Sequence, residues 1–240
     1  MAKIIINEEI ADYHVDEAFR VLRTNLLFCG EDKKVIAVTS SIPGEGKSYV
    51  SLRLAMSLAK VDKKVVFVDA DLRKSMISQR VSGNEANEGL SHYLSGQKKL
   101  PDIVCTTNIK NLNLIMAGPV PPNPAELLNE EIFARMIKAL RCVYDYVIID
   151  APPLGSVIDC AIIAEKCDGA IMVIESDAVS GRFVEENVRQ LEKSGCLIIG
   201  AVLNKMDRRK QGRYGKYYGK YGKKYSKYGD EYIGKANQVR

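Results

Sequence analysis

Apolar and polar positions alternate between two patterns from residue 35 onward. Short runs rich in Val, Ile and Leu predict buried strands, and the longer amphipathic stretches between them predict helices. The expected strands cover residues 35–39, 64–68, 112–116, 146–149, 170–174 and 197–203. The expected helices cover residues 47–60, 90–95, 125–143, 158–166 and 182–194. Uniformly apolar strands that alternate with helices indicate a doubly wound α/β fold with a mostly parallel sheet.

A further helix is expected ahead of the sheet, at about residues 15–28. Its apolar residues at 15, 18, 19, 22 and 26 form one stripe. Glu17, Arg20 and Arg23 follow one another at intervals of three on the other side. Taken alone, this pattern favours a solvated face with ion pairs inside the helix.

Charge divides the chain into two parts. Residues 208–240 carry eleven Lys and Arg against two Asp and Glu, whereas residues 1–207 have a net charge of −4. The basic part also holds seven tyrosines among Gly, Lys and Ser: Tyr214, Tyr217, Tyr218, Tyr221, Tyr225, Tyr228 and Tyr232. Such a segment has too few aliphatic residues to build a core. We therefore expect a folded domain over 1–207 and a flexible tail over 208–240, which on this pattern is either a multi-site substrate or a nucleic-acid-binding arm.

The cysteines and the apolar runs bear on the compartment. Six cysteines are scattered along the chain, with no Cys-x-x-Cys pair, which favours reduced and mostly buried thiols in a cytoplasmic protein. The longest unbroken apolar stretch, around residues 196–203, is much too short to cross a bilayer. The sequence becomes acidic within its first few residues (MAKIIINEEI), which also argues against a signal peptide.

Candidate chemistry begins directly after the first predicted strand. Residues 40–48 read SSIPGEGKS and open a predicted helix, which is the context that a phosphate-binding loop requires. Gly44 and Gly46 let the backbone turn its N–H groups inward, Lys47 is expected to reach the β- and γ-phosphates, and the Ser48 hydroxyl to bind Mg²⁺. The loop departs from the usual pattern because Ser41 replaces its first glycine.

Three carboxylates follow other strands of the predicted sheet. Asp69 and Asp71 come at the end of the second strand, and Asp150 follows residues 146–149. Because parallel strands end at one edge of a sheet, we expect these side chains to converge on the loop. Asp150 has the position of a carboxylate that binds the waters around Mg²⁺ in a phosphotransferase. Of Asp69 and Asp71, one can serve that shell while the other accepts a proton from the attacking group.

The motifs SSIPGEGKS, VDADLR and VIIDAPP, in this order, resemble those of the bacterial tyrosine kinase family. That family has a P-loop ATPase fold of the deviant type, related to cell-division and plasmid-partition ATPases. The resemblance implies ATP and Mg²⁺ as cofactors, Lys47, Asp69, Asp71 and Asp150 as catalytic residues, and Asp69 as the candidate base. It further implies metal binding by Ser48, Asp71 and Asp150, and contact with phosphate charge by Arg73 and Lys74. Nucleotide binding is implied for Ser41, Pro43, Gly44, Glu45, Gly46, Lys47, Ser48, Tyr49 and Asn204.

The same resemblance extends to both ends of the chain. The segment EAFRVLR is similar to the family's Glu-x-x-Arg-x-x-Arg element, which implies that Glu17, Arg20 and Arg23 form an oligomer interface. The tail resembles the family's autophosphorylation cluster. The expected function is therefore a protein-tyrosine kinase that phosphorylates its own tail in trans and regulates capsular or exopolysaccharide synthesis. The resemblance implies a homo-oligomeric ring of eight subunits, in the cytoplasm at the inner face of the plasma membrane. The implied partners are the cytoplasmic tail of a membrane activator, a phosphotyrosine phosphatase and tyrosine-containing protein substrates.

One alternative comes from another class of protein. A partition-type ATPase would use the basic, Tyr-rich tail to bind nucleic acid or a membrane, since aromatics and lysines together stack bases and pair phosphates. The loops of those ATPases resemble Lys-Gly-Gly-x-Gly-Lys, with a first lysine that reaches across a dimer. The matching position here is Ile42, followed by Pro43. The kinase hypothesis therefore comes first, with no nucleic-acid partner expected.

Overall fold

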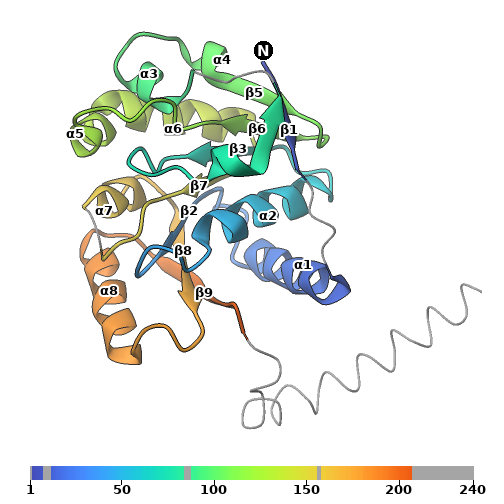
Figure 1. Cartoon of the computed structure of the whole chain (residues 1–240), viewed down its shortest axis with the longest axis vertical. Coiled ribbons are helices and arrows are strands. Elements are labelled where there is room, and N and C mark those ends of the chain that lie inside the picture. The colour runs from blue at the N-terminus through green and yellow to red at the C-terminus, as the bar shows by residue number, and fades with distance from the viewer. Residues whose placement is uncertain (1, 8–11, 84–87, 156–157, 207–240) are drawn as a thin grey trace, which may run out of the picture. The chain divides into compact units, whose positions relative to one another are not determined.

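One sheet organises the part of the chain that the computed structural model describes, which is residues 2–7, 12–83, 88–155 and 158–206. Nine strands in this part lie in the order β4-β1-β5-β6-β3-β7-β2-β8-β9 (Figure 1). β4 pairs antiparallel with β1, β5 pairs antiparallel with β6, and the remaining neighbours are parallel. The strands are β1 (Lys3–Ile6), β2 (Val35–Ser40), β3 (Val65–Asp69), β4 (Val81–Gly83), β5 (Val104–Thr107), β6 (Leu112–Ile115), β7 (Tyr146–Asp150), β8 (Gly169–Glu175) and β9 (Ile198–Asn204).

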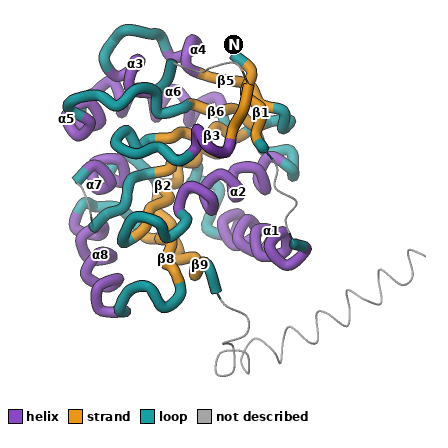
Figure 2. The backbone as a smooth tube through the Cα atoms, viewed as in Figure 1, coloured by secondary structure: helices purple, strands orange, loops and turns teal. Residues whose placement is uncertain are grey.

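Helices cover both faces of this sheet (Figure 2). The helical elements are α1 (Tyr13–Phe28), α2 (Lys47–Ala59), the 3₁₀ turn η1 (Ile77–Arg80), α3 (Leu90–Leu94), α4 (Leu100–Ile103), α5 (Pro124–Asn129), α6 (Glu131–Val143), α7 (Asp159–Ala164) and α8 (Gly181–Lys193). One apolar core lies between the sheet and α1, α2 and η1. The other lies between the sheet and α3 to α8.

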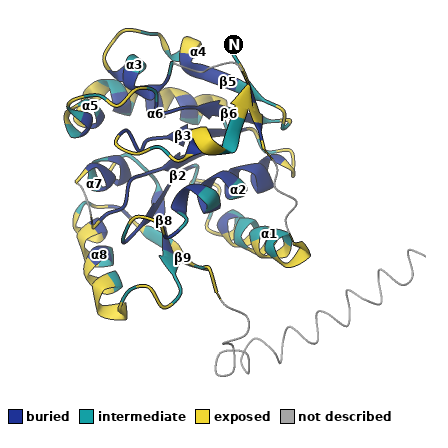
Figure 3. Ribbon diagram, in the orientation of Figure 1, coloured by how far each residue is buried: buried dark blue, intermediate teal, exposed yellow. Residues whose placement is uncertain are grey.

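The burial of the central strands explains their uniformly apolar sequences. Every residue of β2, β3 and β7 is buried, because helices cover the sheet on both sides (Figure 3). On α6, Phe133, Met136, Ile137 and Leu140 recur at intervals of three and four and form its buried stripe. These elements confirm the predicted doubly wound α/β fold.

The structure corrects one predicted helix and adds elements that the sequence pattern did not show. Residues 125–143 do not form one helix, because Glu130 is extended (φ −64°, ψ 149°) and separates α5 from α6. This break lets α5 contact α7 while α6 lies along β7. The elements β1, β4, β5, η1 and α4 were not predicted, and each has only three or four residues. Elements this short carry too little periodicity to be recognised.

The central strands set the position of the functional residues. β3, β7 and β2 are adjacent and parallel, with Asp69 opposite Asp150 and Asp150 opposite Val38. Their carboxyl ends therefore meet at one edge of the sheet, where β2 runs into the loop that precedes α2. This edge is where ligands bind in open α/β sheets.

The chain divides into a compact unit, Met1–Asn204, and a second unit, Lys205–Arg240. The seven tail tyrosines all lie outside the described residues, so the proposed boundary at 207 stays a prediction. Within the described residues, no helix is long and apolar enough to span a membrane. The six cysteines are free thiols, of which Cys29 and Cys142 are exposed.

Candidate active site

The loop between β2 and α2 has the backbone geometry that phosphate binding requires. Gly44 (φ 90°) and Gly46 (φ 92°) both adopt left-handed conformations, which side-chain-bearing residues rarely adopt. Gly46 is also the N-cap residue of α2, so the free N–H groups of the first helical turn adjoin the loop. A helix N-terminus with such N–H groups favours a bound anion.

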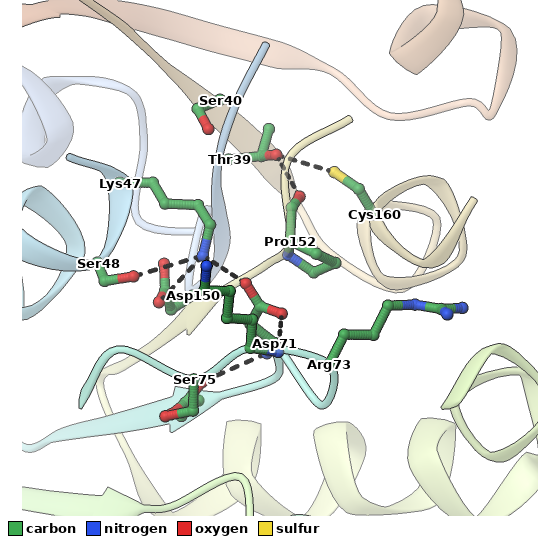
Figure 4. A network of polar contacts seen from close by, with 12 residues as sticks. Thr39, Ser40, Lys47, Ser48, Asp71, Arg73, Ser75, Asp150, Pro152 and Cys160 are labelled. Carbon is green, nitrogen blue, oxygen red and sulfur yellow. Dashed lines mark hydrogen bonds and ion pairs between the residues drawn. The ribbon is translucent and has the colours of Figure 1, made fainter. Parts of the chain in front are cut away.

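Lys47, at the start of α2, lies among the predicted carboxylates (Figure 4). Its Nζ is 2.9 Å from Oδ2 of Asp71, 3.5 Å from Oδ2 of Asp150 and 3.4 Å from Oγ of Ser48. Only 9% of the lysine side chain is exposed. Burial acts to lower the pKa of Lys47, but the nearby Asp150 and Asp71 outweigh it and raise that pKa above its usual value.

Asp150, the last residue of β7, is fully buried beside this lysine. Neither of its carboxylate oxygens has a hydrogen-bond partner within the described part of the chain. Burial raises the pKa of Asp150, while the charge of Lys47 acts in the opposite direction. A buried carboxylate whose oxygens accept no hydrogen bond from the described residues, close to the Ser48 hydroxyl, matches the oxygen ligands that Mg²⁺ prefers.

The residues fit a magnesium ion that is held mainly by its own waters and by phosphates. The described residues contain no ready-made group of three or more His, Cys, Asp or Glu that could hold a metal. Mg²⁺ keeps several waters and commonly uses one or two carboxylates together with substrate phosphates, so few protein ligands suffice. Ser48, Asp71 and Asp150 thus remain a predicted ligand set, and their placement suits it.

Asp69 and Asp71 have different partners although they are two residues apart. β3 ends at Asp69 and the chain then bends, so Asp71 turns to Lys47 while Asp69 accepts a hydrogen bond from the Ser75 hydroxyl. The backbone N–H of Asp71 also donates to Oδ1 of Asp69 (3.3 Å). Burial, with repulsion from Asp150, raises the pKa of Asp69 to about 8. Sequence reasoning missed Ser75, because a serine in an irregular segment carries no pattern.

The other residues predicted to bind nucleotide differ in their burial and in their contacts with the loop. Asn204, at the end of β9, donates from Nδ2 to the carbonyl oxygen of Glu45 (2.8 Å). The buried hydroxyl of Ser41 has no hydrogen-bond partner among the described residues. Pro43 is exposed. The ring of Tyr49, in the first turn of α2, packs edge-on against Phe19 of α1, with 5.9 Å between centroids.

Arg73 was expected to handle phosphate charge, together with Lys74. The structure instead pairs its guanidinium with the buried carboxylate of Asp159, through Nε (2.7 Å) and Nη2 (3.0 Å). Asp159 is the first residue of α7. Arg73 thus ties the segment after β3 to α7, while the backbone N–H of Lys74 donates to Asp71 (3.0 Å).

The polar face of α1 carries an ion pair within the helix, as the spacing of its charges predicts. Arg20 and Glu17 form this exposed pair. Arg23 points elsewhere, because its Nη1 donates to the carbonyl oxygen of Ser57 on α2 (3.1 Å) and lies 3.3 Å from the Ser57 hydroxyl. An interface role for Glu17, Arg20 and Arg23 stays a prediction.

Comparisons with known proteins agree with this fold. A family model described as an AAA domain matches residues 33–194. The tyrosine-protein kinase CpsD of Streptococcus agalactiae is 42% identical over 204 residues, which cover 84% of this chain and 89% of that protein.

Solved structures give the same result. The kinase domain of Escherichia coli tyrosine kinase ETK superposes with a TM-score of 0.77 at 30% identity, over 87% of this chain and 90% of that one. The septum site-determining protein MinD of Pyrococcus horikoshii, solved with Mg-ADP, gives a TM-score of 0.63 at 26% identity, over 73% and 71%. The predicted relation to cell-division ATPases is thereby confirmed, and the chain belongs to the bacterial tyrosine-protein kinase family.

Proposed function

We propose that this chain transfers the γ-phosphoryl group of ATP to tyrosine hydroxyls, and that its own C-terminal tyrosines in a neighbouring subunit are the first acceptors. The observation that carries the proposal is the position of Lys47 between Asp71 and Asp150, at the phosphate-binding loop and next to Asp69. This grouping supplies the parts that phosphoryl transfer needs, namely N–H groups and a cation for the phosphates and a carboxylate for the incoming hydroxyl.

The loop and Lys47 would hold the nucleotide. The N–H groups of residues 46–48, at the start of α2, are available for the phosphate oxygens, and Lys47 can turn from the carboxylates to the β- and γ-phosphates. Ser48, Asp71 and Asp150 would hold Mg²⁺, which when bound neutralises charge on the phosphate oxygens. Lys47 has a raised pKa and so remains charged throughout the working pH range.

Asp69 is the proposed base. As the phosphoryl group transfers, the tyrosine oxygen forms a bond to the γ-phosphorus, the bond to the bridging oxygen breaks, and ADP leaves. The phenolic proton passes to a carboxylate oxygen of Asp69. A pKa of about 8 suits this role, because a general base works best when its pKa lies near the operating pH.

The tail suits a multi-site acceptor. Its seven tyrosines stand among glycines and lysines, and its charge of +9 favours approach to the acidic body of a neighbouring subunit. Each phosphate adds about −1.5 to −2 charge, so a few modifications would cancel the tail's charge and loosen the oligomer. Control of capsular or exopolysaccharide synthesis through a membrane activator belongs to the same proposal, and the family resemblance supports it.

The partition-type ATPase remains the alternative function. Ile42 stands at the position of the lysine that those enzymes use across a dimer, and its backbone N–H is already bonded to the Glu45 carboxylate (2.9 Å). Binding of DNA by the intact chain at physiological salt, and its loss on removal of residues 208–240, would favour that alternative.

Mass spectrometry after incubation with ATP and Mg²⁺ tests the proposal. We expect phosphate on several of the seven tail tyrosines in the purified chain and none in Lys47→Met. Lys110→Met, which alters an exposed ion pair with Asp62, is the matched control and should phosphorylate normally. Phosphotyrosine that persists in purified Lys47→Met would contradict the kinase mechanism.

A further inference from the structure

Glu45 is a fully buried carboxylate inside the phosphate-binding loop. Its Oε2 accepts a hydrogen bond from the N–H of Ile42, at the start of the same loop (2.9 Å). Its Oε1 accepts one from the N–H of Glu175, the last residue of β8 (3.1 Å). A carboxylate this close to a phosphate site repels the phosphates, so we expect it to contribute to the site in another way.

The main chain at Glu45 is held as well. Asn204, the last residue of β9, donates from its amide nitrogen to the Glu45 carbonyl oxygen (2.8 Å). The approach is so close that a Cβ on Gly46 would lie 2.2 Å from that nitrogen. Asn204 is itself tied to the end of β8, because the N–H of Ser176 donates to its carbonyl oxygen (2.9 Å). The side chain and the main chain of Glu45 thus connect the loop to the ends of two strands.

The opposite side of the loop is anchored to the segment that follows β7. The N–H groups of Leu154 and Gly155 donate to the carbonyl oxygens of Ser40 and Ser41, at 2.8 and 3.1 Å. The first residues of the loop are therefore held between β7 on one side and β8 and β9 on the other. On the β8 and β9 side, the Glu45 carboxylate and the Asn204 amide make the contacts.

We infer that Glu45 is a positioning residue that fixes the phosphate-binding loop in its anion-binding shape before nucleotide arrives. Both of its oxygens are engaged by backbone N–H groups and its side chain is buried, so the nucleotide contact expected of Glu45 from the sequence would fall to its main chain. Because the carboxylate accepts its hydrogen bonds from the N–H groups of Ile42 and Glu175, it does not occupy the N–H groups of residues 46–48, which stay available to the phosphates. A loop held ready in this way avoids the cost of ordering on binding. The inference rests on the proposed function in taking ATP as the ligand.

Titration of the nucleotide-free chain with Mg-ADP by calorimetry tests this role. We expect Glu45→Ala to bind ADP about tenfold more weakly, because the binding-competent loop is then populated only a fraction of the time. Glu45→Gln keeps the size and one acceptor oxygen, so its affinity should lie between those of Ala and Glu. In phosphorylation assays, KM for ATP should rise while kcat at saturating ATP changes by less than about twofold, since uniform binding alone is lost.

Glu186→Ala, on the exposed face of α8, is the matched control and should leave ADP affinity unchanged. Amide hydrogen exchange gives a second measurement, in which Ile42 and Glu175 should lose protection in Glu45→Ala without nucleotide. If Glu45→Ala does not fold, Glu45→Gln carries the test, with its thermal unfolding compared to that of the unsubstituted chain.

Equal ADP affinity in Glu45→Ala, Glu45→Gln and the unsubstituted chain would overturn the inference alone. A fall in kcat with KM unchanged would also overturn it, because it would place Glu45 in the chemical step. Failure of the unsubstituted chain to bind ADP would overturn the proposed function and this inference together.

Discussion

Replacing Lys47 by Met tests whether the lysine holds the site together before any nucleotide binds. The substitution keeps the length of the side chain but leaves Asp71 and Asp150 facing each other without their shared cation. Lys47 is 9% exposed, Asp71 is 6% exposed and Asp150 is fully buried, so water screens these charges little. Breaking a buried ion pair from one side typically costs about 3–5 kcal/mol.

We take about 3 kcal/mol for Lys47→Met at pH 8, because Asp150 can relieve part of the cost by taking up a proton. For a domain of this size, roughly 2–4 °C of melting temperature corresponds to 1 kcal/mol. The variant without nucleotide should therefore unfold about 6–12 °C below the unsubstituted chain. The deficit should shrink at pH 5, because burial has already raised the pKa of Asp150 and acid removes its unpaired charge.

Thermal unfolding followed by circular dichroism at pH 8 and at pH 5 measures both effects. Lys110→Met removes the lysine of an exposed pair with Asp62 and should cost less than about 1 kcal/mol at either pH. The reasoning fails if Lys47→Met melts within 2 °C of the unsubstituted chain at pH 8, or if its deficit grows on acidification.

Two further predictions concern pH. The value of kcat/KM for ATP should rise with pH and level off above about 8, because Asp69 has a pKa of about 8 and accepts a proton only when ionised. Asp69→Asn should lower this value by at least about a hundredfold and abolish its rise with pH, and a variant that kept the same pH profile would refute Asp69 as the base. Burial alone would raise the pKa of Asp168, but hydrogen bonds from Arg141, Val35 and Lys34 lower it overall. Asp168→Asn should therefore cost about 2 kcal/mol in urea unfolding at pH 7. This cost should be constant above about pH 5 and shrink below about pH 4, because the unfolded carboxylate then takes up a proton while the lowered pKa of the native carboxylate resists it; a gap that widened in acid would contradict this.

Much of the fold followed from hydrophobic patterning, because buried parallel strands and amphipathic helices have distinct periods. The expected strands at 35–39, 64–68 and 146–149 match β2, β3 and β7 to within one residue at each end. The break at Glu130 was missed, because Glu is a good helix former and a single extended residue inside a helical pattern leaves no period in the sequence.

The site divides in the same way. Lys47, Ser48, Asp69, Asp71 and Asp150 could be named from motif spacing, since strand ends in a parallel sheet share an edge. Ser75 could not, because it lies in the irregular segment after β3, and Asp159 could not, because this α7 residue meets Arg73 of that segment only in the folded chain. The direction of Arg73, toward Asp159 and away from Lys47, depended on the same loop geometry (Figure 4).

The sequence by itself determined the α/β fold, the phosphate-binding loop, the three carboxylates and the division into an acidic body and a basic, Tyr-rich tail. These depend on periodicity, short-range spacing and composition, which are local properties of the chain. The tertiary structure decided which groups face one another. It paired Lys47 with Asp71 and Asp150, and it turned Glu45 inward to Ile42 and Glu175. Such pairings join residues up to about 130 positions apart, and only the packing of the sheet brings their atoms within hydrogen-bonding distance.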